Sequence, residues 1–192
     1  MPAMDAALAP EPISLPPAPR LYTADDIFFF LEAGLLDPEA KFELMDGEIV
    51  PMSPKGRHHE ALREEFMSWL RQPWASVFNL TIEHTLRLDD GTLLEPDFLL
   101  YDHARRIADA PLTGVDIKLA IEVADTSWGY DTKAKAAKYA AFGIQEYWAV
   151  HAVRRIARVH RGPAASGWAE TTNFKRGDTL TPLCAREATW RL

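Results

Sequence analysis

Cysteine, positive charge and long apolar runs are all scarce in this sequence. Cys184 is the one cysteine among 192 residues, which excludes an internal disulfide framework and a cysteine-based zinc site and fits a reducing cytoplasm. No apolar run approaches the roughly 20 residues that a membrane span needs. The first residues also lack a basic end followed by an apolar core, the pattern of a secretory signal. We therefore expect a cytoplasmic protein with no membrane partner.

Acidic residues outnumber basic ones, 28 to 21, so the formal net charge is −7. A protein that binds nucleic acid mainly through electrostatics is usually basic, and this balance counts against a tight, non-specific binder. It is compatible with a local basic patch, and with an enzyme whose acidic site is partly neutralised by a metal ion.

Prolines gather at the start of the chain. Residues 1–20 hold six of the 14 prolines and few large apolar side chains, a composition typical of disordered segments. The remaining residues are enough to bury a core. We predict a proline-rich disordered arm at 1–20 and a single domain at 21–192.

Local signals predict two helices and a hairpin in the first half of that domain. "YTADDIFFFLEAGLL" begins with Thr23 as an N-cap and stops at Gly34, and residues 58–70 have apolar positions at helical spacing. Asp46-Gly47 stands between two short runs, "KFELM" and "EIVPM", and favours a tight hairpin.

The second half alternates between strand and helix patterns. "VFNLTIEHTLRL" alternates like one strand, which Asp90-Gly91 turns into a second, "LLEPDFLLY". After a loop at 103–118 come the strand "KLAIEVA", the helix "YDTKAKAAKYAAFG" and the strand "QEYWAVH", a unit that implies a parallel pair of strands. The tail predicts a hairpin around Gly162-Pro163 and an edge-forming end.

Two carboxylates lie in apolar surroundings. Glu122 shares one face of its strand with Ala120 and Ala124, and a lone glutamate in a buried strand needs a partner, a proton or a metal ion. Asp97 raises the same question at the mouth of the preceding strand, "EPDFLLY". Two carboxylates on adjacent strands would repel each other, and a divalent cation such as Mg²⁺ or Mn²⁺ relieves the repulsion.

Structural explanations exist for both acids. Asp97 could cap backbone donors in a turn, and Glu122 could form a buried salt bridge with Lys135 or Lys138. Helical periodicity places Asp131 and Lys135 on one face with Lys138 beside them, and it does not choose between the two lysines.

The combination of motifs resembles a known family. "EPD", followed about 25 residues later by "IEV", resembles the PD-(D/E)xK nuclease superfamily. The segments "YTADDIFFFLEAG", "FELMDGEIVPMSP", "EPDFLLY" and "LAIEVADTSWGYDTKAKAAKYAAFGIQEYWAVH" together resemble the Uma-two family of restriction-endonuclease-like proteins, over roughly residues 21–160.

The resemblance implies a fold and a function. The fold is an α/β restriction-endonuclease-like core, a mixed β-sheet flanked by helices, with an N-terminal helix and hairpin. The function is that of a metal-dependent endonuclease that hydrolyses phosphodiester bonds in nucleic acid, with DNA as the favoured substrate, and a homodimer is compatible with it. The alternative is a non-catalytic module of the same fold for binding, assembly or regulation, which the acidic net charge favours.

The resemblance also implies the site residues. Asp97 and Glu122 would bind Mg²⁺ or Mn²⁺. The superfamily lysine normally lies two residues after the second acid, at the position of Ala124, but in this family it is displaced to the next helix, where a D…K…Y pattern selects Lys135.

Two more residues match the family, and one departs from it. Glu43 matches the glutamate of the "EL.DGE" segment, and His59 matches a histidine at the start of the next helix. His151 stands where relatives commonly carry an aspartate, outside the predicted catalytic set.

Overall fold

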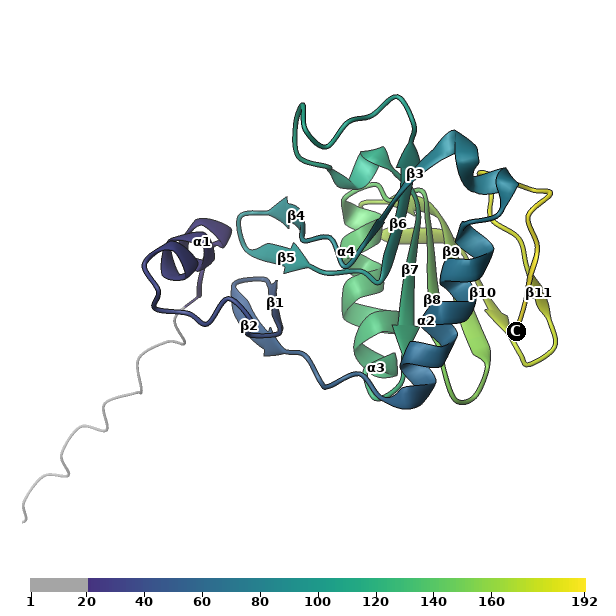
Figure 1. The fold of residues 1–192 in the computed structure, drawn as a ribbon, viewed down its shortest axis with the longest axis horizontal. Helices are drawn as coiled ribbons and strands as arrows, with labels where there is room; N and C mark the ends of the chain where they lie inside the picture. Colours follow the sequence, from purple (N-terminus) through teal and green to yellow (C-terminus); the bar gives the residue numbers. More distant parts are fainter. Residues whose placement is uncertain (1–20) are drawn as a thin grey trace, which may run out of the picture.

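The computed structural model describes residues 21–192, so the predicted arm at 1–20 lies outside the described part of the chain. The described residues form a six-stranded mixed sheet with helices on both faces, and a four-stranded sheet beside it that carries the first helix (Figure 1). This is the α/β arrangement, with N-terminal helix and hairpin, that the resemblance predicted.

The helical segments are α1 (Ala24–Glu32), α2 (Arg57–Leu70), the 3-10 turns η1 (Pro73–Val77) and η2 (Gly114–Asp116), α3 (Trp128–Tyr130), the π turn η3 (Asp131–Lys135) and α4 (Ala136–Ala141). The strands are β1 (Phe42–Met45), β2 (Glu48–Pro51), β3 (Phe78–Ile82), β4 (Leu86–Asp89), β5 (Thr92–Leu94), β6 (Phe98–Asp102), β7 (Ile117–Ala124), β8 (Glu146–His151), β9 (Ile156–Ala164), β10 (Gly167–Phe174), β11 (Thr179–Leu180) and β12 (Trp190–Arg191).

The strand order of the large sheet is β10-β9-β8-β7-β6-β3. β7 and β8 are parallel, and every other neighbouring pair is antiparallel. The helical segment from α3 to α4 joins the parallel pair, which confirms the strand–helix–strand prediction. This segment starts earlier than predicted, at Trp128, and Gly143 ends it with a φ of 81°.

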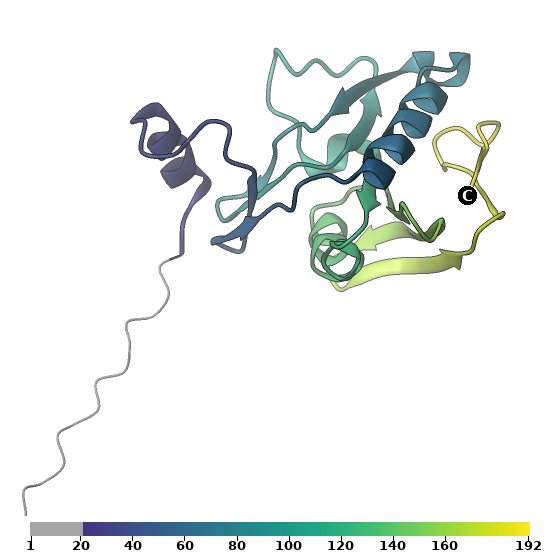
Figure 2. The same ribbon diagram turned by 60° about the horizontal axis from the view of Figure 1, so that its bottom comes forward.

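The two faces of the sheet bury different cores. α2 covers one face and the α3–α4 segment covers the other (Figures 1 and 2). The alternation predicted for β7 is confirmed, because Leu119, Ile121 and Val123 pack in the α2 core whereas Ala120 packs in the α4 core with Tyr139. Glu122 therefore points toward α4.

The four-stranded sheet has the order β2-β1-β5-β4 and carries α1. The predicted helix start is confirmed, since Thr23 and Asp26 form a reciprocal capping box. The predicted hairpin is confirmed too. Asp46 and Gly47 both have positive φ, 52° and 83°, as a type I′ turn requires.

The prediction of one strand over residues 77–88 is wrong. β3 and β4 belong to different sheets, and Glu83 between them has a φ of 48°, which turns the chain out of the large sheet. The segment "LLEPDFLLY" is divided in the same way into β5 and β6, around Pro96, which has no N–H for a ladder. From β3 to β6 the chain thus leaves the large sheet for the small one and then returns to it.

The prediction of a turn at Gly162-Pro163 is also wrong, although the hairpin exists. Both residues lie inside β9, and the reversal comes at residues 165–166. The pairing of β9 with β8 ends at Arg161, so the missing N–H of Pro163 costs no bond in that ladder. Among residues 21–192, no helix has the length and apolar character to cross a membrane.

Candidate active site

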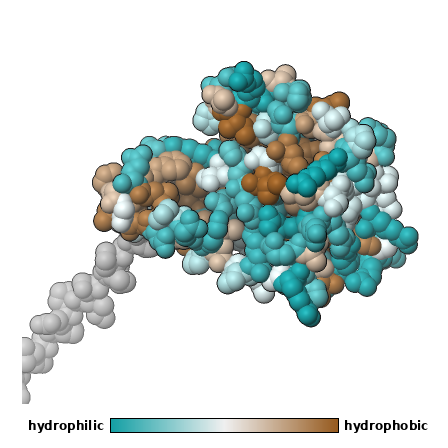
Figure 3. Space-filling view, in the orientation of Figure 1, coloured by the Kyte–Doolittle hydropathy of each residue, from teal (hydrophilic) through white to brown (hydrophobic). Residues whose placement is uncertain are grey.

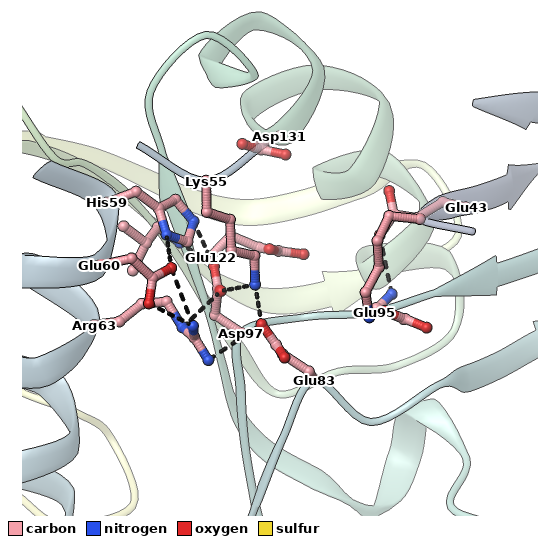
Figure 4. Close-up of polar contacts among 12 residues, drawn as sticks. Glu43, Lys55, His59, Glu60, Arg63, Glu83, Glu95, Asp97, Glu122 and Asp131 are labelled. Atoms are coloured by element: carbon pink, nitrogen blue, oxygen red, sulfur yellow. Dashed lines mark hydrogen bonds and ion pairs between the residues drawn. The ribbon is translucent and has the colours of Figure 1, made fainter. Parts of the chain in front are cut away.

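All five predicted site residues line one cleft of about 440 Å³. It opens where the two sheets meet, and each residue comes from a different part of the chain; Figure 4 labels four of the five, Glu43, His59, Asp97 and Glu122. These residues are Glu43 in β1, His59 in α2, Asp97 immediately before β6, Glu122 in β7 and Lys135 at the end of the π turn.

Lys135 is the buried cation of the cleft. Its Nζ lies 2.8 Å from Glu43 Oε1, 2.8 Å from Glu122 Oε1 and 3.8 Å from Asp131 Oδ1. Burial disfavours the charged form of Lys135, but these carboxylates favour that form more strongly. The pKa of Lys135 is therefore raised well above its usual value. Lys138 instead pairs with Asp46, outside the cleft, so the geometry brings Lys135, and not Lys138, to the acids.

Glu122 is fixed from the helix side. Lys135 Nζ and the Tyr139 hydroxyl both donate hydrogen bonds to its Oε1, at 2.8 and 2.9 Å. Burial, together with the charges of Asp131, Asp97 and Glu43, raises the pKa of Glu122 to about 8, against the opposing effect of Lys135. Burial and the nearby carboxylates thus disfavour the ionised form of Glu122, and Lys135 favours it.

Asp97 lies beside cationic groups and an N–H donor that favour its ionised form. Its Oδ2 accepts the Val123 N–H at 2.8 Å and lies 3.5 Å from His59 Nε2. Its Oδ1 lies 3.3 Å from Lys55 Nζ and 3.2 Å from Arg63 Nε (Figure 4). Burial opposes ionisation, but His59, Lys55 and the Val123 N–H together lower the pKa of Asp97. Asp97 thus bonds a backbone donor of the neighbouring strand, β7, rather than one in its own turn.

Sequence reasoning missed three residues that contact Asp97 or its partners. Lys55 lies in an irregular loop, where no periodicity marks it, and Glu83 lies at the unpredicted break after β3. Arg63 had a usable signal, because it follows His59 by one helical turn and so lies on the same face of α2.

The donors fit a magnesium-type ion in part. Asp97 and Glu122 come from adjacent strands, and carboxylate oxygens are the ligands that Mg²⁺ and Mn²⁺ prefer when most other positions are filled by water or substrate. In residues 21–192, no group of three or more His, Cys, Asp or Glu side chains is arranged to hold a metal ion. The fit is therefore that of an open two-carboxylate site, not of a closed protein cage.

Comparison with known proteins assigns the family. A family model named Uma2 and described as "putative restriction endonuclease" matches residues 28–191. No curated protein matches this chain. A solved structure from Anabaena variabilis, described as a "putative nuclease belonging to DUF820", superposes with a TM-score of 0.66, covers 84% of this chain and 91% of its own, and is 20% identical. The chain belongs to the Uma2 family and has a restriction-endonuclease-like fold, as the sequence predicted.

Proposed function

We propose that this protein is a metal-dependent endonuclease that hydrolyses phosphodiester bonds in DNA. Membership of a family described as putative restriction endonucleases supports a nuclease-like function. The observation that carries the proposal is the convergence of Asp97, Glu122 and Lys135 from three separate elements on one cleft. Cytoplasmic location and assembly as a homodimer stay predictions.

In this proposal Asp97 and Glu122 hold Mg²⁺ or Mn²⁺. The ion, when bound, would activate water and stabilise charge on the phosphate oxygens. Glu122 suits this role because burial, with the neighbouring carboxylates adding to it, raises its pKa, and a bound cation would stabilise the ionised form. Asp97 suits it because His59 and the Val123 N–H keep its carboxylate ionised and fix its orientation.

Lys135 would stabilise the negative charge that develops on the phosphate. A buried ammonium group is effective because it acts in a water-poor site and needs no reorientation. Its ion pairs with Glu43 and Glu122 hold the group in position. Glu43 also accepts the N–H of Glu95 at 2.9 Å, which ties β1 to the segment that carries Asp97.

The test is cleavage of supercoiled DNA, single-stranded DNA and single-stranded RNA with Mn²⁺, Mg²⁺ or a chelator. We expect metal-dependent cleavage of DNA by the wild type, and a loss of at least about 100-fold in Asp97→Asn, Glu122→Gln and Lys135→Gln. Lys138→Gln is the matched control, because this lysine lies on the same helical segment but pairs outside the cleft. Equal cleavage by wild type and Asp97→Asn would sink the proposal.

The alternative is a non-catalytic module for binding, assembly or regulation. It is favoured by one observation, that protein cations already contact both acids: Lys55 and Arg63 contact Asp97, and Lys135 contacts Glu122. Thermal unfolding with and without Mn²⁺ distinguishes the metal-dependent enzyme from the non-catalytic module. A site that binds metal shifts the melting temperature upward in the wild type and not in Asp97→Asn, whereas a module without a site shows no shift.

A purely structural role for the Glu122–Lys135 pair predicts a different result again. If the pair only holds the fold, Glu122→Gln removes one of the two carboxylates that lie 2.8 Å from Lys135 and lowers the free energy of unfolding by up to about 3–5 kcal/mol, with Glu43 as the close partner that remains. If the carboxylates are clustered for function, Glu122→Gln keeps or gains stability while activity is lost. Urea unfolding of the two proteins makes this comparison.

A further inference from the structure

Glu83 adopts a backbone conformation that glutamate rarely takes. It lies between β3 and β4 with a φ of 48°, in the left-handed region that costs a residue with a Cβ about 1–2 kcal/mol and that glycine adopts without cost. Its side chain pairs with Lys55 Nζ, and its Oε1 lies 3.1 Å from Arg63 Nη2. The strained position therefore brings a carboxylate between two cations.

Lys55 and Arg63 are each shared between Glu83 and Asp97, and Arg63 also contacts a third acid, Glu60, whose Oε2 lies 3.1 Å from its Nη1. Both contact Glu83 on one side and Asp97 Oδ1 on the other, at 3.3 Å from Lys55 Nζ and 3.2 Å from Arg63 Nε (Figure 4). The Asp97 side chain is 5% exposed, whereas those of Lys55 and Glu83 are 27% and 34% exposed. The Glu83 side of this arrangement is accordingly the side open to a ligand.

The two cations converge on a single oxygen, Glu83 Oε1. An ammonium group and a guanidinium group that meet on one anionic oxygen also suit a phosphate oxygen, and arginine is well matched to phosphate geometry. Lys55 lines the cleft, and Arg63 lines a separate shallow surface groove that Arg57, Glu60 and Glu64 also line. A polyanion that leaves the cleft toward α2 would cross both side chains.

We propose that Lys55 and Arg63 form a phosphate clamp beside the cleft, and that Glu83 is its internal counter-ion, which a phosphate of the substrate displaces. This inference rests on the proposed function, since it takes the substrate to be a nucleic acid strand. Glu83 keeps the two cations in position when no strand is bound, and it competes with the phosphate for them.

The clamp makes a prediction that a structural ion-pair network does not. If the network only ties the β3–β4 break to α2, then Glu83→Gln lowers stability and leaves the affinity for nucleic acid unchanged. If Glu83 competes with phosphate, its removal increases the affinity about threefold to fivefold, the size expected for one partly exposed ion pair. Removal of Lys55 or Arg63 weakens binding by a similar or larger factor.

The experiment is fluorescence anisotropy of labelled short oligonucleotides, single-stranded DNA, duplex DNA and single-stranded RNA, with the full chain in a chelator, so that cleavage is absent. The variants are Glu83→Gln, Lys55→Gln, Arg63→Gln and Glu83→Gly, the last because glycine suits the positive φ and guards against misfolding. The control for Glu83 is Glu170→Gln, which removes the same charge from an exposed position on β10, the opposite edge of the sheet. The control for Lys55 is the exposed Lys133→Gln.

We expect both Glu83 variants to bind more tightly than Glu170→Gln, and Lys55→Gln and Arg63→Gln to bind more weakly than Lys133→Gln. Glu83 variants no tighter than Glu170→Gln overturn the clamp, as does the absence of measurable binding by every protein in the set. Cleavage assays with Mn²⁺ on the same samples keep the two proposals separate. Cleavage with unchanged binding rejects the clamp alone, and the expected binding pattern without cleavage rejects the nuclease alone.

Discussion

On the α4 face of the sheet, burial shifts the pKa of an acid and of a base in opposite directions. Burial raises the pKa of Glu122 to about 8 and lowers the pKa of His160 to about 4, because in each case it penalises the charged form. Lys135 is equally buried, but its carboxylate neighbours outweigh burial and stabilise the charge. Whether a buried group on this face is charged thus depends on its partners.

His160 provides a test of this balance through pH. Its ring stacks on Tyr147 at 5.6 Å and contacts Trp168, and its Nε2 is buried without a hydrogen-bond partner among the described residues. The folded pKa lies below the unfolded one, so the neutral ring stabilises the fold fully above the unfolded pKa, about 6.5. This stabilisation is lost as the pH falls from there toward about 4, and we expect the loss to be about 2–3 kcal/mol.

His160→Phe should remove that part of the pH dependence, since phenylalanine keeps the ring stack and does not titrate. Urea unfolding at neutral and acidic pH measures the difference. The control is His103→Gln at an exposed histidine, which should leave the pH profile as in the wild type. A wild-type profile as flat as that of His160→Phe between neutral pH and about pH 4 would contradict the assignment.

At the scale of elements, the sequence predicted several features that local signals determine, although the local signal at Gly162-Pro163 misplaced a turn. The N-cap at Thr23, the turn at Asp46-Gly47 and the alternation of β7 all depend on neighbouring residues, and all are confirmed. The break at Glu83 was missed because the apolar alternation of residues 77–88 continues through it, and only the separation of the two sheets requires it.

The same limit applies to the candidate site. Asp97, Glu122 and Lys135 were found through a motif order that the family shares. Lys55 was missed because it approaches Asp97 across 42 positions of the sequence, from a loop without periodicity. Contacts made by loops depend on tertiary packing, and no local pattern encodes them.

Two glycines near the ends of the α3–α4 segment make a matched pair. A Cβ added at Gly114 would lie 2.2 Å from the Phe142 carbonyl oxygen at the end of α4, whereas one added at Gly129 in α3 has no atom within 4 Å. We expect Gly114→Ala to lower the free energy of unfolding by at least about 2 kcal/mol, because backbone must move. Gly129→Ala should raise it by about 0.5–1 kcal/mol, through helix propensity.

Chemical denaturation measures the free energy of unfolding of the two variants and of the wild type. The comparison is matched because each variant adds a single methyl group. A Gly114→Ala protein as stable as the wild type would mean that the η2 turn does not press against the end of α4. A loss of stability in Gly129→Ala would mean that α3 is not helical in solution.

At the scale of the whole molecule, the three buried clusters differ greatly in size. The clusters on the two faces of the large sheet are extensive and share β7. Within the described part of the chain, the cluster under α1 has only Ala24, Ile27, Leu44 and Leu93 as buried members, with partly buried side chains such as Phe30 packed against them. Apolar side chains remain exposed around α1, including Phe28 and Phe29, and Figure 3 shows brown patches among teal ones at that end of the molecule. The N-terminal helix is therefore held by little buried area.

Native-state hydrogen exchange should resolve this difference. We expect amides of α1 to exchange through local opening with a free energy at least about 2 kcal/mol below that of amides in β7 and β8, because the opening of a small cluster exposes little apolar surface. Ile27→Ala is the diagnostic variant, since Ile27 is buried only in the α1 cluster. It should speed exchange in α1 and leave β7 as in the wild type. If Ile27→Ala speeds exchange in α1 and β7 equally, α1 opens only when the whole molecule unfolds. The two sheets would then be one cooperative unit, and the cleft between them a rigid one.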